Sequence, residues 1–177
     1  MAEAVKRPLE ELVNRLDLPQ FHVRWVRPKN MHLTLRFLGN IPRQEVPAIS
    51  GAAREAASGI SAFSSRLQGL GSFPSSGNPR IVWVGMENDR PLMWLERHLT
   101  RSLGAIGLPP PDKPFRPHLT LGRVKSNRGI QELKKHLERN RTADVGAMTV
   151  DQICLIRSEH RPSGPLYTVL DRLPLAG

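Results

Sequence analysis

The sequence contains the tetrapeptide His-Leu-Thr-Leu twice, at residues 32–35 and again at residues 118–121. With six histidines and six threonines in the chain, chance yields only about 0.2 His-x-Thr occurrences, so two identical copies indicate a shared role. A histidine side chain can take up or release a proton near neutral pH. Two imidazoles can therefore serve as the acid and the base of one displacement, while threonine hydroxyls donate hydrogen bonds to charged oxygens.

Basic residues surround both copies. The chain carries a formal net charge of +10, Arg36 follows the first copy, and Arg116 and Arg123 flank the second. A positive field of this kind favours polyanions, and a phosphodiester would use both the proton transfers and the hydrogen bonds. A metal site fits less well, because each His-x-Thr supplies one ligand and neither copy has a carboxylate or a cysteine within a few residues. We expect phosphodiester chemistry with no metal and no other cofactor.

Both copies are predicted to lie at the start of a strand. Residues 32–38 alternate in hydrophobicity, and so do residues 118–121 after a proline-rich loop. Successive side chains of a strand point to opposite faces. In each copy the histidine and the threonine would therefore share one face, while the leucines point into the core. The four candidate catalytic residues are His32, Thr34, His118 and Thr120.

Four further residues are candidates for substrate binding. Strand alternation would place Arg36 and Arg116 on the faces that carry the two His-Thr pairs. Arg123 would lie on the opposite face of an ideal strand, but the twist at the end of the motif could turn it inward. Tyr167 lies in the closing strand. The alternative for the arginines is a solvated surface position with no role.

The same order of predicted elements occurs twice along the chain: a helix, the His-Leu-Thr-Leu strand, a second helix and a two-stranded hairpin. This order predicts an α+β fold of two lobes related by a pseudo-twofold axis, with antiparallel sheets, helices on the outside and one motif in each lobe. The motifs would then face each other across a central cleft. The helices are expected at residues 3–16, 43–57, 91–106 and 129–140, and the hairpins at residues 63–86 and 148–173.

The composition is that of an ordinary folded domain, with 39% hydrophobic and 24% charged residues. We expect residues 1–177 to form a single bilobal domain. No apolar run approaches the roughly 20 residues that span a membrane, and the first residues lack the apolar core of a signal peptide, so a cytoplasmic protein is expected, with a monomer as the default. Four aromatic residues are interpreted as core and the only cysteine as buried and inert: Phe37, Trp83, Trp94, Phe115 and Cys154.

Five segments together resemble the RNA 2′,3′-cyclic phosphodiesterases, historically called 2′-5′ RNA ligases, of the two-histidine phosphoesterase superfamily. They are WVRPKNMHLTLRFLG at 25–39, GLGSFP at 69–74, PRIVWVG at 79–85, FRPHLTLGR at 115–123 and GPLYTVL at 164–170. The resemblance runs from about residue 3 to the end of the chain. It implies the bilobal α+β fold and hydrolysis of a terminal 2′,3′-cyclic phosphate on RNA to a 2′-phosphate, without a metal.

The same resemblance implies the roles of the motif residues. At the matching positions His32 corresponds to the proton donor, His118 to the base that activates water, and Thr34 and Thr120 to phosphate ligands. RNA ends and small cyclic nucleotides present the same phosphate, so both are expected as partners. Two alternatives stay open, because the same acid and base also serve them: a ligase that joins a cyclic phosphate to a 5′-hydroxyl, and a module that binds RNA ends or nucleotides without turnover.

Overall fold

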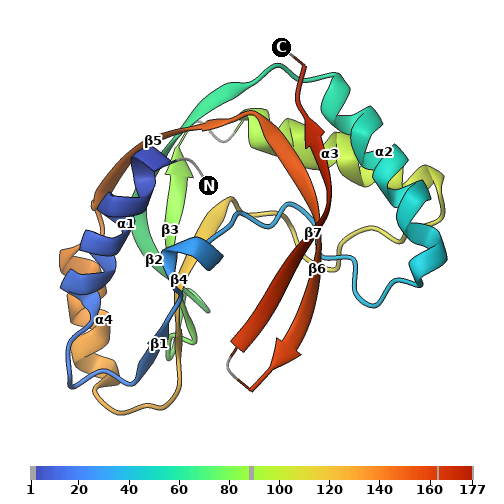
Figure 1. The fold of residues 1–177 in the computed structure, drawn as a ribbon. Coiled ribbons are helices and arrows are strands. Elements are labelled where there is room, and N and C mark those ends of the chain that lie inside the picture. Colours follow the sequence, from blue (N-terminus) through green and yellow to red (C-terminus); the bar gives the residue numbers. More distant parts are fainter. Residues whose placement is uncertain (1–2, 88–89, 163, 177) are drawn as a thin grey trace. The chain divides into compact units, whose positions relative to one another are not determined.

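The computed structural model describes residues 3–87, 90–162 and 164–176, and the chain folds as two compact units (Figure 1). The described residues form four α-helices and seven β-strands, and the strand pairs with an assigned register are antiparallel. The predicted α+β class is therefore confirmed. The first unit comprises Met1–Thr34, Ser64–Asp89 and Pro117–Met148, and the second comprises Leu35–Phe63, Arg90–Arg116 and Thr149–Gly177.

The first unit is built on a five-stranded sheet in the order β1-β4-β3-β2-β5. Its strands are β1 (Val23–Trp25), β2 (Phe63–Phe73), β3 (Ile81–Glu87), β4 (His118–Val124) and β5 (Asp144–Val150). Two helices accompany the sheet, α1 (Glu3–Leu16) and α4 (Ile130–Arg139), and each buries one apolar face. The apolar side chains of α1 recur at helical spacing, so that its buried positions are Val5, Leu9, Leu12, Val13 and Leu16.

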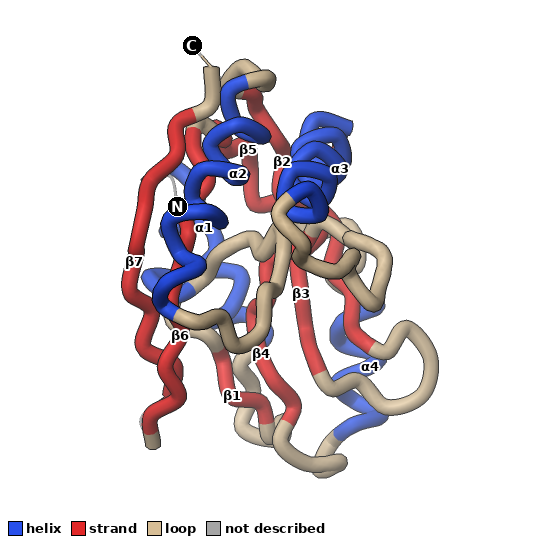
Figure 2. Tube along the Cα trace, turned by 90° about the vertical axis from the view of Figure 1, so that its right-hand side faces the viewer, coloured by secondary structure: helices blue, strands red, loops and turns tan. Residues whose placement is uncertain are grey.

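The second unit combines two helices with a long antiparallel hairpin. The helices α2 (Val46–Ser58) and α3 (Arg90–Ala105) pack side by side (Figure 2), and the hairpin consists of β6 (Gln152–Arg161) and β7 (Gly164–Pro174). A short 3-10 turn at Arg43–Glu45 leads into α2. One apolar cluster joins these elements, with alanines from α2, leucines from α3 and Ile153 and Leu173 from the hairpin.

The predicted helices and the first hairpin agree with the structure within a few residues, but two strand predictions are wrong. Residues 32–38 do not form a strand, and only Leu33 makes an isolated bridge. The second hairpin begins at Gln152 rather than at residue 148, because Met148–Val150 belong to β5 and Asp151 lies between the strands. The apolar residues continue on both sides of Asp151. The hydrophobic pattern of the sequence therefore does not show where the chain leaves the five-stranded sheet and enters the hairpin.

Three burial predictions are also wrong. Phe37 is 80% exposed and Trp94 is 37% exposed, so neither is a core residue. Cys154 is exposed as well, because it alternates along β6 with the buried Ile153 and therefore points to the other face of the hairpin. Trp83 and Phe115 are half-buried.

Glycine allows an aromatic ring to lie on the sheet of the first unit. A Cβ added to Gly71 of β2 would stand 2.1 Å from Cζ2 of Trp83 on β3. We expect Gly71→Ala to lower the free energy of unfolding by about 1–3 kcal/mol, because the ring must move. Gly51→Ala is the control, since nothing lies within 4 Å of its added Cβ in the helix α2. This variant should gain about 0.5–1 kcal/mol in urea unfolding, and equal losses in the two variants would contradict the packing.

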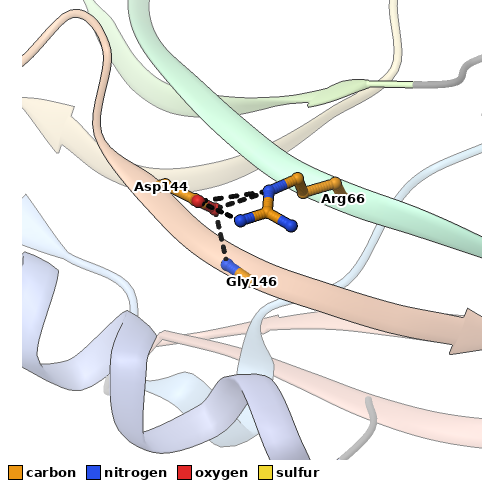
Figure 3. Close-up of polar contacts among 3 residues, drawn as sticks. All are labelled: Arg66, Asp144 and Gly146. Atoms are coloured by element: carbon orange, nitrogen blue, oxygen red, sulfur yellow. Dashed lines mark hydrogen bonds and ion pairs between the residues drawn. The ribbon is translucent and has the colours of Figure 1, made fainter.

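An exposed ion pair links β2 to β5 (Figure 3). Arg66 donates to both carboxylate oxygens of Asp144, with Nε 3.1 Å from each, and the backbone N–H of Gly146 donates to Oδ1 at 3.0 Å. The hydrogen bond from Arg66 is the largest cause that lowers the pKa of Asp144, and the Gly146 amide adds to it. The charged carboxylate therefore stabilises the fold above its ordinary pKa, and this stabilisation is lost as the pH falls through the lowered value.

The variant Asp144→Asn is accordingly expected to be slightly less stable than the wild type at neutral pH. The difference should shrink with falling pH and disappear once Asp144 is protonated in the wild type, because both side chains are then neutral. Urea unfolding of both proteins across this pH range measures the effect. High salt should reduce the difference at neutral pH, and a difference that persists in acid would show that lost shape rather than lost charge is responsible.

Candidate active site

The second His-Leu-Thr-Leu copy opens the strand β4, as the sequence predicts. Leu119 and Leu121 are 1% and 0% exposed, whereas His118 and Thr120 are half-buried. The alternation follows from the period of two in a strand, which sends the leucines into the core of the first unit. The imidazole and the hydroxyl therefore share the other face of β4.

The first copy reaches the same strand by a different route. β1 pairs with β4 as far as Trp25 opposite Gly122, and then a 3-10 turn at Pro28–Asn30 takes the chain away from the sheet. The chain returns at Leu33, which bridges Leu119 in antiparallel orientation. Because Leu119 pairs with Val84 of β3 on its other side, Leu33 and β1 use the same edge of β4. The first copy is thus an irregular continuation of β1.

The Leu33–Leu119 bridge fixes the register between the two motifs. In an antiparallel pair of this register the position of His32 is opposite Thr120, and the position of Thr34 is opposite His118. Residues directly opposite each other in such a pair have Cβ atoms about 4.5–5.5 Å apart. A local twofold axis passes through the bridge, because a rotation by half a turn would exchange residues 32–34 with residues 118–120. If this register extends one residue on either side of the bridge, the four motif residues form two opposed His-Thr positions.

The expectation that the two motifs lie in separate lobes is wrong. His32–Thr34 and His118–Leu121 both belong to the first unit, and the chain enters the second unit at Leu35. Leu35 is partly buried against the apolar cluster of that second unit. The leucines of the first copy therefore contribute to different units. The sequence halves do not coincide with the folded units, because each unit takes segments from both halves.

The two imidazoles have different surroundings. His32 Nδ1 lies 2.9 Å from the carbonyl oxygen of Asn30, and since a carbonyl only accepts, Nδ1 must carry the proton. The lone pair of the neutral ring is then on Nε2. His118 contacts two aromatic rings, with Phe73 edge-on at a centroid distance of 5.0 Å and Trp83 tilted at 6.3 Å. Sequence reasoning overlooked Phe73 as a neighbour of the site, although it lies in the quoted segment GLGSFP.

A second indole belongs to the same sheet. Trp25 of β1 covers Gly122 of β4, where an added Cβ would stand 2.7 Å from its ring. Trp83 covers Gly71 in the same manner on the neighbouring strands. Each of these two tryptophans is paired with a glycine on the neighbouring strand. The sequence alone does not reveal this pairing, because the strand register must be known first.

The predicted substrate-binding residues are divided between the units. Arg123 is exposed at the end of β4, in register with Arg24 of β1. Arg36, Arg116 and Tyr167 belong to the second unit, where Arg36 donates to the carbonyl of Pro109 and Tyr167 is half-buried on β7. Because residues 32–38 are not a strand, the alternation that placed Arg36 beside His32 does not apply. Roles for these four side chains stay predictions.

Two further features of the described residues bear on the site. Within residues 3–87, 90–162 and 164–176, no three His, Cys, Asp or Glu side chains group in a way that could hold a metal ion. In the same residues, no helix has the length and apolar character needed to cross a membrane.

Comparison with known proteins adds an independent line of evidence. The model of the LigT-like phosphoesterase family matches the chain twice, at residues 1–83 and at residues 84–167. Each match contains one His-Leu-Thr-Leu copy, which agrees with the internal duplication. A solved structure from Thermus thermophilus is 32% identical and aligns with a TM-score of 0.82, covering 100% of this chain and 94% of the other.

Two relatives are each called RNA 2′,3′-cyclic phosphodiesterase. The protein from Methanothermobacter thermautotrophicus is 31% identical over 169 residues, which cover 96% of this chain and 91% of the relative. The protein from Aquifex aeolicus is 32% identical over 178 residues, with coverages of 99% and 94%. The chain therefore belongs to the LigT-like phosphoesterase family of hydrolases.

Proposed function

We propose that the protein hydrolyses the terminal 2′,3′-cyclic phosphate of RNA to a 2′-phosphate by acid-base catalysis with His32 and His118. The observation that carries this proposal is the Leu33–Leu119 bridge, whose register pairs each histidine with the threonine of the other motif. The names of the relatives supply the substrate class. RNA with a cyclic phosphate end and small cyclic nucleotides are the proposed substrates, and no metal takes part.

In this mechanism His118 accepts a proton from water as the water oxygen attacks phosphorus. The bond between phosphorus and the 3′ oxygen breaks, and His32 donates the proton that makes the 3′-hydroxyl. The phosphate stays on the 2′ oxygen, so one water is consumed and each histidine changes its protonation once. The assignment of acid and base follows the family resemblance, and it agrees with the Nδ1 proton of His32, which leaves Nε2 as the nitrogen that exchanges protons.

Charge develops on the non-bridging oxygens as water adds to phosphorus. Thr34 and Thr120 are proposed to donate hydrogen bonds to these oxygens, since in the register of the Leu33–Leu119 bridge each threonine position is opposite a histidine position. Arg36, Arg116, Arg123 and Tyr167 are proposed to hold the phosphate or the nucleotide. We further propose that the protein acts as a cytoplasmic monomer.

The experiment is incubation of the pure protein with RNA ending in a 2′,3′-cyclic phosphate, in the presence of a chelator. The expected product is RNA with a 2′-phosphate, identified by mass and by its resistance to enzymes specific for 3′-phosphates. Unchanged RNA that nevertheless binds tightly would replace the proposal with the binding module. A 2′,5′-joined product with an added 5′-hydroxyl RNA would favour the ligase, and activity lost only with chelator would contradict the metal-independent mechanism.

The hydrolysis rate should depend on pH as a bell, because one histidine must be protonated and the other neutral. The measurement is kcat/KM for a 2′,3′-cyclic nucleotide between pH 5 and 9. In a variant that lacks either histidine, the pH profile of the remaining kcat/KM should lose either its acidic or its basic limb. A flat profile in the wild type would contradict a mechanism in which two histidines exchange protons.

A further inference from the structure

An exposed stripe of cationic and aromatic side chains runs along α3 in the second unit. Its members recur three or four residues apart, which places them on one helix face. The opposite face is buried in the apolar cluster through Leu95, Leu99 and Leu103. We call this surface the α3 stripe, and its residues are the exposed Arg90, Trp94, Arg97 and Arg101 and the half-buried His98.

The tryptophan of the stripe stacks on one neighbour and lies near a second. Its ring stacks on the imidazole of His98, with centroids 3.6 Å apart and planes 32° from parallel. An atom of the ring edge, Cη2, lies 3.6 Å from the position of a Cβ on Gly59, at the end of α2. Trp94 is nevertheless 37% exposed. An exposed indole that is stacked on a neighbouring ring offers a flat surface to a ligand.

Cations surround this ring. Trp94, Arg97, His98 and Arg101 together line a surface hollow of about 250 Å³. Within the part of the chain that the structure describes, Arg97 and Arg101 have no carboxylate within ion-pair distance. The only acid in α3 is Glu96, which is 7% exposed and accepts a hydrogen bond from Thr100 at 2.8 Å. The α3 stripe therefore presents positive charge, while the one acidic residue of its own helix is buried.

We propose that the α3 stripe binds single-stranded RNA, with one base stacked on Trp94 and the arginines on neighbouring phosphates. An aromatic ring between cations suits a base between phosphates, and such contacts tolerate any sequence. From Arg90 to Arg101 the helix rises about 16 Å, enough to follow a short stretch of backbone. The choice of RNA rests on the proposed function, whereas the binding chemistry rests on the stripe alone.

The test measures binding rather than hydrolysis. A labelled single-stranded RNA that ends in a 3′-phosphate contains no cyclic phosphate, so its fluorescence anisotropy reports affinity even where the protein fails to hydrolyse RNA. The double variant Arg97→Gln, Arg101→Gln should raise Kd about tenfold or more and reduce the slope of log K against log salt by about 1.4. Trp94→Leu should weaken binding about tenfold through lost stacking, with a nearly unchanged salt slope.

The matched control removes the same charge from another exposed helix. Arg7→Gln with Arg15→Gln lowers the net charge by two on α1, in the first unit. The proposal expects this variant to bind the RNA within about twofold of the wild type, since only the long-range field changes. An equal loss in both double variants would assign binding to the overall charge and overturn the proposal. Unchanged affinity in the stripe variants, with circular dichroism confirming that they fold, would overturn it as well.

Discussion

Alanine at His32 or at His118 is expected to lower the rate of cyclic phosphate hydrolysis by about 10²–10⁴-fold, the usual worth of one positioned acid or base. The measurement is kcat for a 2′,3′-cyclic nucleotide, with the stability of each variant checked by thermal unfolding. The double variant should lose little more than either single variant, because the two groups act in one step. His160→Ala, at an exposed position on β6, is the control and should keep full activity.

A second substrate separates the acid from the base. A p-nitrophenyl phosphodiester releases a phenolate that needs no proton, so the loss of a general acid should matter much less with this substrate than with a cyclic nucleotide. His32→Ala is expected to regain most of its activity there, while His118→Ala stays impaired. The reverse pattern would exchange the two roles, and equal losses on both substrates would contradict a division into acid and base.

Replacement of Leu119 by alanine is expected to lower the free energy of unfolding by about 2–5 kcal/mol, the range for buried leucines. Leu119 is 1% exposed and pairs with Val84 on one side and Leu33 on the other. The variant leaves a cavity directly behind the strand that carries His118. Urea unfolding followed by the fluorescence of Trp25 and Trp83, which lie on the same sheet, measures the loss in the first unit.

The comparison for this variant is Leu166→Ala on β7. Leu166 is 38% exposed, so its truncation removes less buried surface and should cost under about 1 kcal/mol. Leu119→Ile retains the volume and is expected to recover most of the stability lost by alanine. If alanine at Leu119 cost no more than alanine at Leu166, the leucines of the motif would not be the anchors of the site.

The spacing of apolar residues in the sequence predicted those helices and strands whose formation depends on neighbouring residues. The helices follow from apolar spacing. The second motif alternates as predicted because β3 pairs with His118, Leu119 and Thr120 in an unbroken register, which shifts only at Leu121. The first motif has the same letters but no strand, because Pro28 and the turn that follows it displace the chain before Leu33 meets β4. The hydrophobic pattern therefore predicted correctly which side chains of the second motif share a face. It predicted the wrong backbone conformation for the first motif.

The division into units could not be predicted from local patterns. Thr34 and Leu35 are neighbours in the motif but belong to different units, since Leu35 finds its apolar partners among residues far away in the sequence. The exposure of Phe37 and Trp94 is a result of the same kind, because residue type alone does not say which face of the chain a distant segment covers. The four motif residues were found from the sequence, but their mutual register was not.

The Leu33–Leu119 bridge has a consequence for the regiochemistry of the proposed reaction. A site in which rotation exchanges acid and base would accept a cyclic phosphate in either direction and could open it to a 2′- or a 3′-phosphate. A single product requires that the two ends of the site differ. Here they do, since Phe73 and Trp83 border His118, while the Asn30 carbonyl orients His32. The neighbours of the motifs, rather than the motifs themselves, would then decide which ribose oxygen leaves.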